Sequence, residues 1–160
     1  MERIFLTFFY VGYLRPAPGT WGSLAGALIA AILLRIYGEA AQNTLVLLSV
    51  LLFFISIGVI NSYEKKTGEH DSSFIVIDEV VGVWIAMAFG GGYFINMVLA
   101  FVFFRLFDIY KPSIIGRIDK EVKGGLGVML DDVVAGVFAG ILTLIVQKIV
   151  YQIGFESLWF

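Results

Sequence analysis

The stretch that decides the fold is TLVLLSVLLFFISIGVI, residues 44–60, which carries no charged side chain. A helix that crosses a bilayer needs about 17–25 apolar residues. Residues 44–60 have that length, so we expect them to form a transmembrane helix. The chain should therefore be an integral membrane protein of the all-α class.

The composition of the whole chain agrees with this interpretation. Hydrophobic residues make up 59% of the 160 residues and charged residues 15%, whereas soluble domains carry about 45–50% and 25%. Mean hydropathy is +0.92, and these values exclude disorder. The chain has no Cys, which excludes a disulfide scaffold, a thiolate metal site and a cysteine phosphatase. The net charge of −2 gives no reason to expect nucleic acid as a partner.

Further apolar stretches lie on both sides of residues 44–60, and they cover residues 21–37, 80–89, 93–104 and 133–150. The first and last are long enough to span a membrane. The middle two are short, and their apolar flanks favour two tilted spans over a hairpin that only dips into the membrane. Residues 1–14 resemble a signal peptide without a cleavage site, so we expect an uncleaved interfacial helix there. We predict one domain over residues 1–160, a small polytopic helix bundle with about four to five spans.

Positive charge predicts the orientation of this bundle. Nine of the 11 Lys and Arg residues fall in segments that five spans place on one side: Arg3, Arg15, Lys65, Lys66, Arg105, Lys111, Arg117, Lys120 and Lys123. Only Arg35 and Lys148 lie near the other side. An excess of Lys and Arg marks the cytoplasmic face. We therefore expect the N-terminus and the loops 61–74 and 108–132 to face the cytoplasm.

Two pairs of adjacent carboxylates stand at predicted span ends on that face. Asp78 and Glu79 open the third span, and Asp131 and Asp132 open the last. One interpretation is that they interact with the positive ends of helix dipoles in headgroup water. The other is a metal site, because hard oxygen ligands from two helix ends suit Mg²⁺. Two pairs flanked by apolar sequence favour the metal site, because a buried carboxylate pair needs a neutralising cation.

Cationic and hydroxyl residues on the same face suit a phosphate. Arg105 and Asp108 are three residues apart, so they share a helix face and form either a salt bridge or part of a phosphate clamp. Lys111 follows three residues later, and Lys123 precedes a Gly-rich stretch whose N–H groups suit an anion. Thr20 is expected to cap the first span at a helix start that also suits phosphate.

Four motifs resemble the phosphatidylglycerophosphatase A family of bacterial membrane enzymes. They are PGTWGSL at 18–24, IDEVVGVWI at 77–85, FRLFDIYKP at 104–112 and GGLGVMLDDVVAG at 124–136. The sequence departs from the family in two loops, at residues 12–16 and 113–115. The resemblance implies Mg²⁺-dependent removal of the terminal phosphate of phosphatidylglycerophosphate, in phospholipid biosynthesis at the cytoplasmic face of the inner membrane. The lipid substrate and the bilayer are the partners it implies.

Residue roles follow from this hypothesis together with side-chain chemistry. Five residues form the catalytic set: Asp78, Glu79, Asp108, Asp131 and Asp132. Of these, Asp78, Glu79, Asp131 and Asp132 hold Mg²⁺, and Asp108 positions water or orients Arg105. Phosphate binding falls to Thr20, Arg105, Lys111 and Lys123. An Asp nucleophile stays open as an alternative to water, and a small ion-coupled transporter or cation channel is the alternative function.

Overall fold

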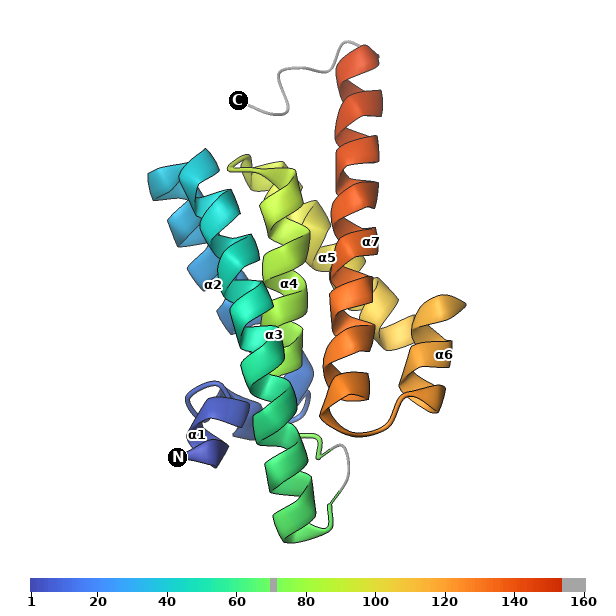
Figure 1. Ribbon diagram of the computed structural model, residues 1–160. Helices are drawn as coiled ribbons and strands as arrows, with labels where there is room; N and C mark the ends of the chain where they lie inside the picture. Colours follow the sequence, from blue (N-terminus) through green and yellow to red (C-terminus); the bar gives the residue numbers. More distant parts are fainter. Residues whose placement is uncertain (70–71, 154–160) are drawn as a thin grey trace.

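The computed structural model describes residues 1–69 and 72–153, and this part of the chain consists of helices joined by turns and loops, without strands. Its elements are α1 (Glu2–Leu6), a 3-10 turn η1 (Val11–Tyr13), α2 (Pro18–Tyr37), α3 (Glu39–Thr67), α4 (Ile77–Gly90), α5 (Phe94–Tyr110), α6 (Ile114–Glu121) and α7 (Gly124–Gln152). Figure 1 shows that the longer helices run side by side in alternating directions. The predicted all-α bundle is confirmed.

Within the described residues, three helices are long and apolar enough to cross a membrane. They are α2, α3 and α7, with mean hydropathies of 1.5, 2.5 and 2.2 over an 18-residue stretch of each. Large apolar side chains on the outer face of α3 are exposed, including Leu47 at 69% and Phe54 at 69%. Such a surface suits lipid rather than water. The predicted first, second and last spans are therefore helices of spanning length.

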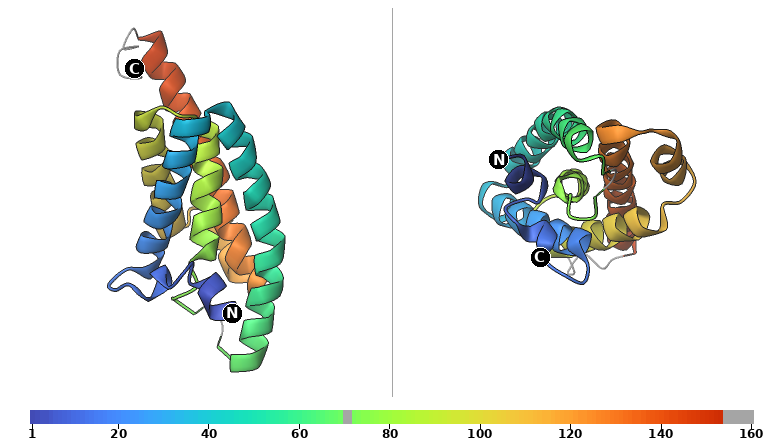
Figure 2. Two further views of the ribbon diagram at one scale, coloured as in Figure 1. Left: turned by 90° about the vertical axis from the view of Figure 1, so that its left-hand side faces the viewer. Right: turned by 90° about the horizontal axis from the view of Figure 1, so that it is seen from below.

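The middle pair is shorter, and α4 lies at the centre of the bundle. The helices α4 and α5 have 14 and 17 residues and are joined by residues 91–93. Seen from below, α4 is surrounded by the other long helices (Figure 2). A Cβ added at Gly136 of α7 would lie 2.3 Å from the carbonyl oxygen of Gly82 in α4, so only glycine allows this approach. Trp84 of α4 donates from Nε1 to the Gly26 carbonyl of α2 at 2.9 Å. These contacts fix the position of α4 against its neighbours.

The last helix begins earlier than the sequence predicts. We expected Asp131 and Asp132 to open the span, but α7 starts at Gly124, so they lie in its third turn. The Gly125 N–H donates to Asn61 Oδ1 at 2.7 Å, and a Cβ on Gly125 would lie 2.6 Å from the Ile57 carbonyl oxygen. Close packing against α3 thus stabilises the helix at the start of α7, although the glycines there disfavour helix on their own. Because these carboxylates are not at a helix start, the helix-dipole interpretation does not apply to them.

The role expected of Thr20 as a helix cap is also wrong. The helix α2 begins at Pro18, and its N-cap residue Ala17 makes no side-chain capping bond. The Thr20 hydroxyl instead accepts a hydrogen bond from Arg105 Nη2 at 3.2 Å. Proline at the first helical position makes a cap less necessary, because it has no N–H to satisfy.

Candidate active site

One cavity, of about 630 Å³, lies at the end of the bundle where α2, α4 and α7 begin and α5 ends. It is lined by every residue that we predicted for the site: Thr20, Asp78, Glu79, Arg105, Asp108, Lys111, Lys123, Asp131 and Asp132. These residues come from segments more than 100 positions apart in the chain. The alternating direction of the helices brings them to the same end.

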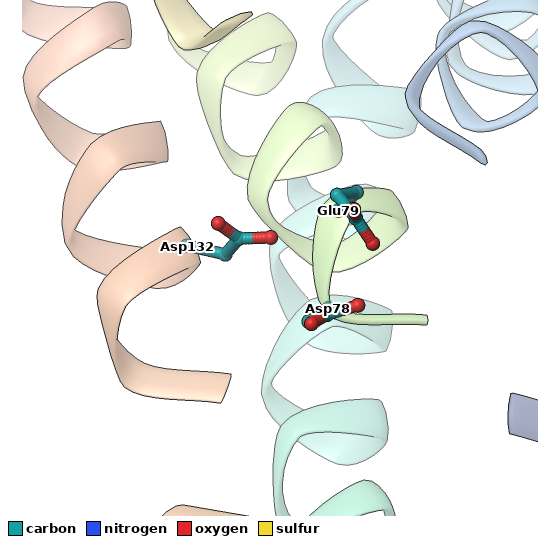
Figure 3. A group of neighbouring side chains, drawn as sticks. All are labelled: Asp78, Glu79 and Asp132. Carbon is teal, nitrogen blue, oxygen red and sulfur yellow. The ribbon is translucent and has the colours of Figure 1, made fainter. Parts of the chain in front are cut away.

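Three carboxylates of the cavity form a triad. Asp78 and Glu79 come from the first turn of α4 and Asp132 from α7, and one oxygen of each lies within 4.8 Å of the others (Figure 3). Asp132 is only 3% exposed. Asp78 Oδ1 and Glu79 Oε2 are buried and have no hydrogen-bond partner in the described part of the chain. Buried anionic oxygens without partners are costly, so the triad fits a bound cation.

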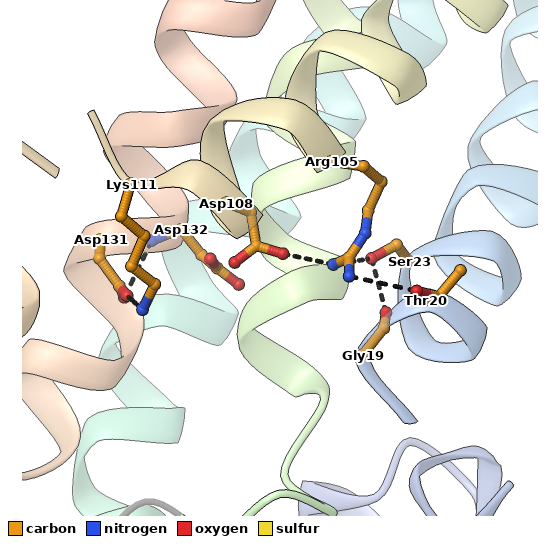
Figure 4. A network of polar contacts seen from close by, with 8 residues as sticks. All are labelled: Gly19, Thr20, Ser23, Arg105, Asp108, Lys111, Asp131 and Asp132. Atoms are coloured by element: carbon orange, nitrogen blue, oxygen red, sulfur yellow. Dashed lines mark hydrogen bonds and ion pairs between the residues drawn. The ribbon is translucent and has the colours of Figure 1, made fainter. Parts of the chain in front are cut away.

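Asp131 does not belong to this triad. Its Oδ2 accepts a hydrogen bond from Lys111 Nζ at 2.6 Å, and Lys111 also donates to Asp119 Oδ1 of α6 at 2.5 Å. Successive residues on a helix point about 100° apart, so Asp132 faces α4 while Asp131 faces Lys111 (Figure 4). Of the four residues predicted to hold Mg²⁺, the structure therefore groups three, Asp78, Glu79 and Asp132.

Lys111 lies in the loop after α5, where it joins α6 to α7. Burial opposes its charge, but its hydrogen bonds to Asp119 and Asp131 outweigh that effect and hold the pKa of Lys111 above its ordinary value. The side chain therefore stays cationic and neutralises Asp131. Asp119 was not among the predicted site residues, because nothing in its spacing from Asp131 indicates that both bind Lys111.

Arg105 lies on the other side of the triad and is held by two helices. It forms the predicted ion pair with Asp108 of its own helix, α5. Its Nη1 also donates to Ser23 Oγ at 3.0 Å and its Nη2 to Thr20 Oγ1 at 3.2 Å, both on α2 (Figure 4). Ser23 was not among the residues predicted for the site. The three-residue spacing of Thr20 and Ser23, which places both hydroxyls on one helix face, is the signal that indicates it.

Three further residues of the cavity have distinct surroundings. Lys123 is the exposed N-cap residue of α7 and makes no ion pair within residues 1–69 and 72–153. Glu64 of α3, which we did not predict, is a buried carboxylate on the cavity wall. A Cβ added at Gly19 of α2 would lie 2.1 Å from Glu79 Oε1, so the backbone of α2 lies directly against the triad.

The fold and the cavity define a helical protein with helices long and apolar enough to span a membrane and a site that suits both a cation and a phosphate. Residues 4–147 match the phosphatidylglycerophosphatase A family, and the chain belongs to it. This membership confirms the predicted family and makes the protein a lipid phosphatase rather than a transporter or channel.

Individual relatives cover most of the chain. Phosphatidylglycerophosphatase A of Haemophilus influenzae is 38% identical over 137 residues, which cover 85% of this chain and 82% of the relative. The protein of the same name from Escherichia coli is 38% identical over 130 residues, 80% of this chain and 73% of the relative. A Bacteroides thetaiotaomicron protein, provisionally named a phosphatidylinositol-3-phosphatase, is 38% identical over 148 residues, 90% of this chain and 92% of the relative. No solved structure matches the chain.

Proposed function

We propose that the protein hydrolyses phosphatidylglycerophosphate to phosphatidylglycerol and inorganic phosphate in a Mg²⁺-dependent reaction, as one phosphatase domain over residues 1–160. The observation that carries this proposal is the triad of Asp78, Glu79 and Asp132, with its unpartnered buried oxygens, in the same cavity as Arg105. Two relatives that bear the name of this activity support the choice of substrate.

The charge of the cavity supports the requirement for a cation. Among the described residues, the walls carry seven carboxylates and three cationic side chains: Glu64, Asp78, Glu79, Asp108, Asp119, Asp131 and Asp132 against Arg105, Lys111 and Lys123. A phosphate monoester is itself an anion and is repelled by such an excess. Carboxylate oxygens are the ligands that Mg²⁺ prefers, so the triad would hold the ion.

When bound, Mg²⁺ offsets phosphate charge and lowers the pKa of a coordinated water. Arg105 binds the phosphate oxygens through its remaining N–H donors, and Thr20 and Asp108 orient its guanidinium. Lys123 contributes a further positive charge at the cavity wall. Lys111 contributes one as well and, through its bonds to Asp119 of α6 and Asp131 of α7, fixes these two helices against each other.

We propose further that the site opens to the cytoplasm from the inner membrane, which the chain crosses several times. The cavity lies at the end of the bundle that carries the N-terminal segment and the loops after α3 and α5. Nine of the 11 cationic residues belong to these segments and their flanks. Positive loops stay on the cytoplasmic side. The acyl chains would then remain in the bilayer while the headgroup enters the cavity.

The test is phosphate release by the purified full-length protein in detergent micelles. We expect release from phosphatidylglycerophosphate with Mg²⁺ and none with EDTA. Asp132→Asn should lower kcat/KM by about 10³-fold, whereas Glu39→Gln, an exposed carboxylate at the far end of the bundle, should leave it unchanged. Release that is indifferent to EDTA would remove Mg²⁺ from the proposal. Faster release from phosphatidylinositol phosphate would overturn the proposed substrate, in favour of the one in the name of the Bacteroides relative.

A further inference from the structure

The hydroxyl of Ser23 is buried at the contact between α2 and α5. Ser23 is 0% exposed. Its Oγ donates to the Gly19 carbonyl oxygen at 2.7 Å and accepts from Arg105 Nη1 at 3.0 Å. A hydroxyl has one hydrogen, so the bond to Gly19 leaves only lone pairs for Arg105. The orientation of this hydroxyl is therefore fixed before any substrate binds.

The hydrogen bonds of Arg105 leave a defined set of free donors. A guanidinium carries five N–H donors. Nη1 uses its two on Asp108 and Ser23, and Nη2 uses one on Thr20. Among the partners that the described residues supply, none takes the Nε–H or the second N–H of Nη2. Two donors are thus left on a side chain that lines the cavity, which is the number that a bidentate phosphate contact requires.

The three protein partners of Arg105 do not constrain it equally. Asp108 is on the same helix, so its ion pair orients the guanidinium relative to α5 but does not link it to α2. Thr20 is exposed and makes the longer of the two bonds from α2. Ser23 is buried and is itself held by the backbone of α2, whose Gly19 lies directly against Glu79. The buried connection between Glu79 and Arg105 is therefore made by the α2 backbone at Gly19 and the Ser23 hydroxyl.

We propose that Ser23 is a positioning residue, whose buried hydroxyl fixes the Arg105 guanidinium against the carboxylate triad and leaves two N–H donors for the substrate phosphate. This inference rests on the proposed function. It gives Ser23 no contact with the reacting atoms, so its effect on catalysis must pass entirely through Arg105. Because its effect depends on Arg105, Ser23 can be distinguished by experiment from a residue that only packs α2 against α5.

A double-mutant cycle tests the dependence. Ser23→Ala, Arg105→Ala and the double variant are compared in the full-length protein, with kcat and KM measured on phosphatidylglycerophosphate and the inhibition constant measured for inorganic phosphate. Ser56→Ala is the matched control, because Ser56 is also buried in a helix but its hydroxyl has no partner in the described structure. Thr20→Ala removes the exposed bond to the same guanidinium.

We expect Ser23→Ala to lower kcat/KM by about 10- to 100-fold and to weaken phosphate inhibition, with a melting temperature close to that of Ser56→Ala. Thr20→Ala should have a smaller effect. In the Arg105→Ala background, Ser23→Ala should cause no further loss. A full additional loss in that background would overturn the inference but leave the role of Arg105 intact. A wild-type protein that is folded yet releases no phosphate would overturn the proposed function, and the inference would fail with it.

Discussion

Replacing Gly19 by alanine tests the position of the triad without removing any carboxylate. The new Cβ would lie 2.1 Å from Glu79 Oε1, and the next atom in its way is the carboxyl carbon of the same side chain at 3.2 Å. The far end of a side chain moves more easily than backbone. We therefore expect Gly19→Ala to displace the Glu79 carboxylate and leave the helices in place.

The size of the displacement sets the size of the effect. Ordinary contact with a Cβ begins at 3.4 Å, so Glu79 Oε1 must move by about 1.3 Å. A misplacement of about 1 Å in a catalytic arrangement costs about 100-fold in rate, which is about 2.7 kcal/mol of transition-state stabilisation. The substitution itself favours helix, because alanine loses less backbone entropy than glycine. The melting temperature should thus stay within about 2 °C of the wild type.

The assay is phosphate release in micelles at several Mg²⁺ concentrations, together with thermal unfolding. Gly19→Ala should lower kcat/KM by about 100-fold and raise the Mg²⁺ concentration needed for half-maximal activity. Gly58→Ala is the control, since nothing lies within 4 Å of a Cβ at Gly58, and it should retain full activity. Wild-type kcat/KM in Gly19→Ala would refute the position that the structure gives to Glu79. A loss of activity that matches a loss of folded protein would refute the claim that only Glu79 moves.

Two further substitutions probe the surroundings of the site. Lys111→Met leaves the Asp131 side chain, 7% exposed, without its cation. It should lower the unfolding free energy, measured in detergent, by about 2 kcal/mol, the value of a hydrogen bond to a charged group. Adding Asp131→Asn should restore most of this loss, and no recovery would contradict the pairing. Trp84→Phe removes the bond to Gly26 and should lower stability by about 1–2 kcal/mol, or about 4 °C in melting temperature. Its activity per folded molecule should equal that of the wild type. A large loss of activity would show that the geometry of the triad depends on the bond from Trp84 to Gly26.

The convergence of the carboxylates could be predicted from the sequence. Asp78 and Glu79 precede one apolar stretch, and Asp131 and Asp132 precede another. Spans of alternating direction bring such starts to the same face of a membrane. The structure places both pairs on one cavity for this reason. The prediction needed only the number and order of spans, which apolar length determines well.

The different environments of Asp131, which pairs with Lys111, and Asp132, which joins the triad, could not be predicted, because they depend on where α7 begins. The glycines at 124 and 125 suggested a loop, since glycine disfavours helix. Their fit against Asn61 and Ile57 of α3 is a tertiary contact that periodicity does not reveal. The bond of Ser23 to Arg105 joins residues 82 positions apart, so the sequence shows only that Ser23 shares a helix face with Thr20 and not what it binds.

The short length of α4 explains how a bundle of apolar helices can hold a carboxylate triad. With 14 residues, α4 begins inside a ring of longer helices, and α3 continues well beyond its first turn (Figure 1). Asp78 and Glu79 are therefore shielded at the sides by protein, and their cavity lies at one end of the bundle. A longer central helix would carry the same two residues out to the headgroup layer, where water would satisfy their oxygens and weaken their hold on a cation. If the triad holds Mg²⁺ as proposed, the headgroup must enter the cavity to reach the ion, so a change in the depth at which α4 starts should alter catalysis even with the same three carboxylates.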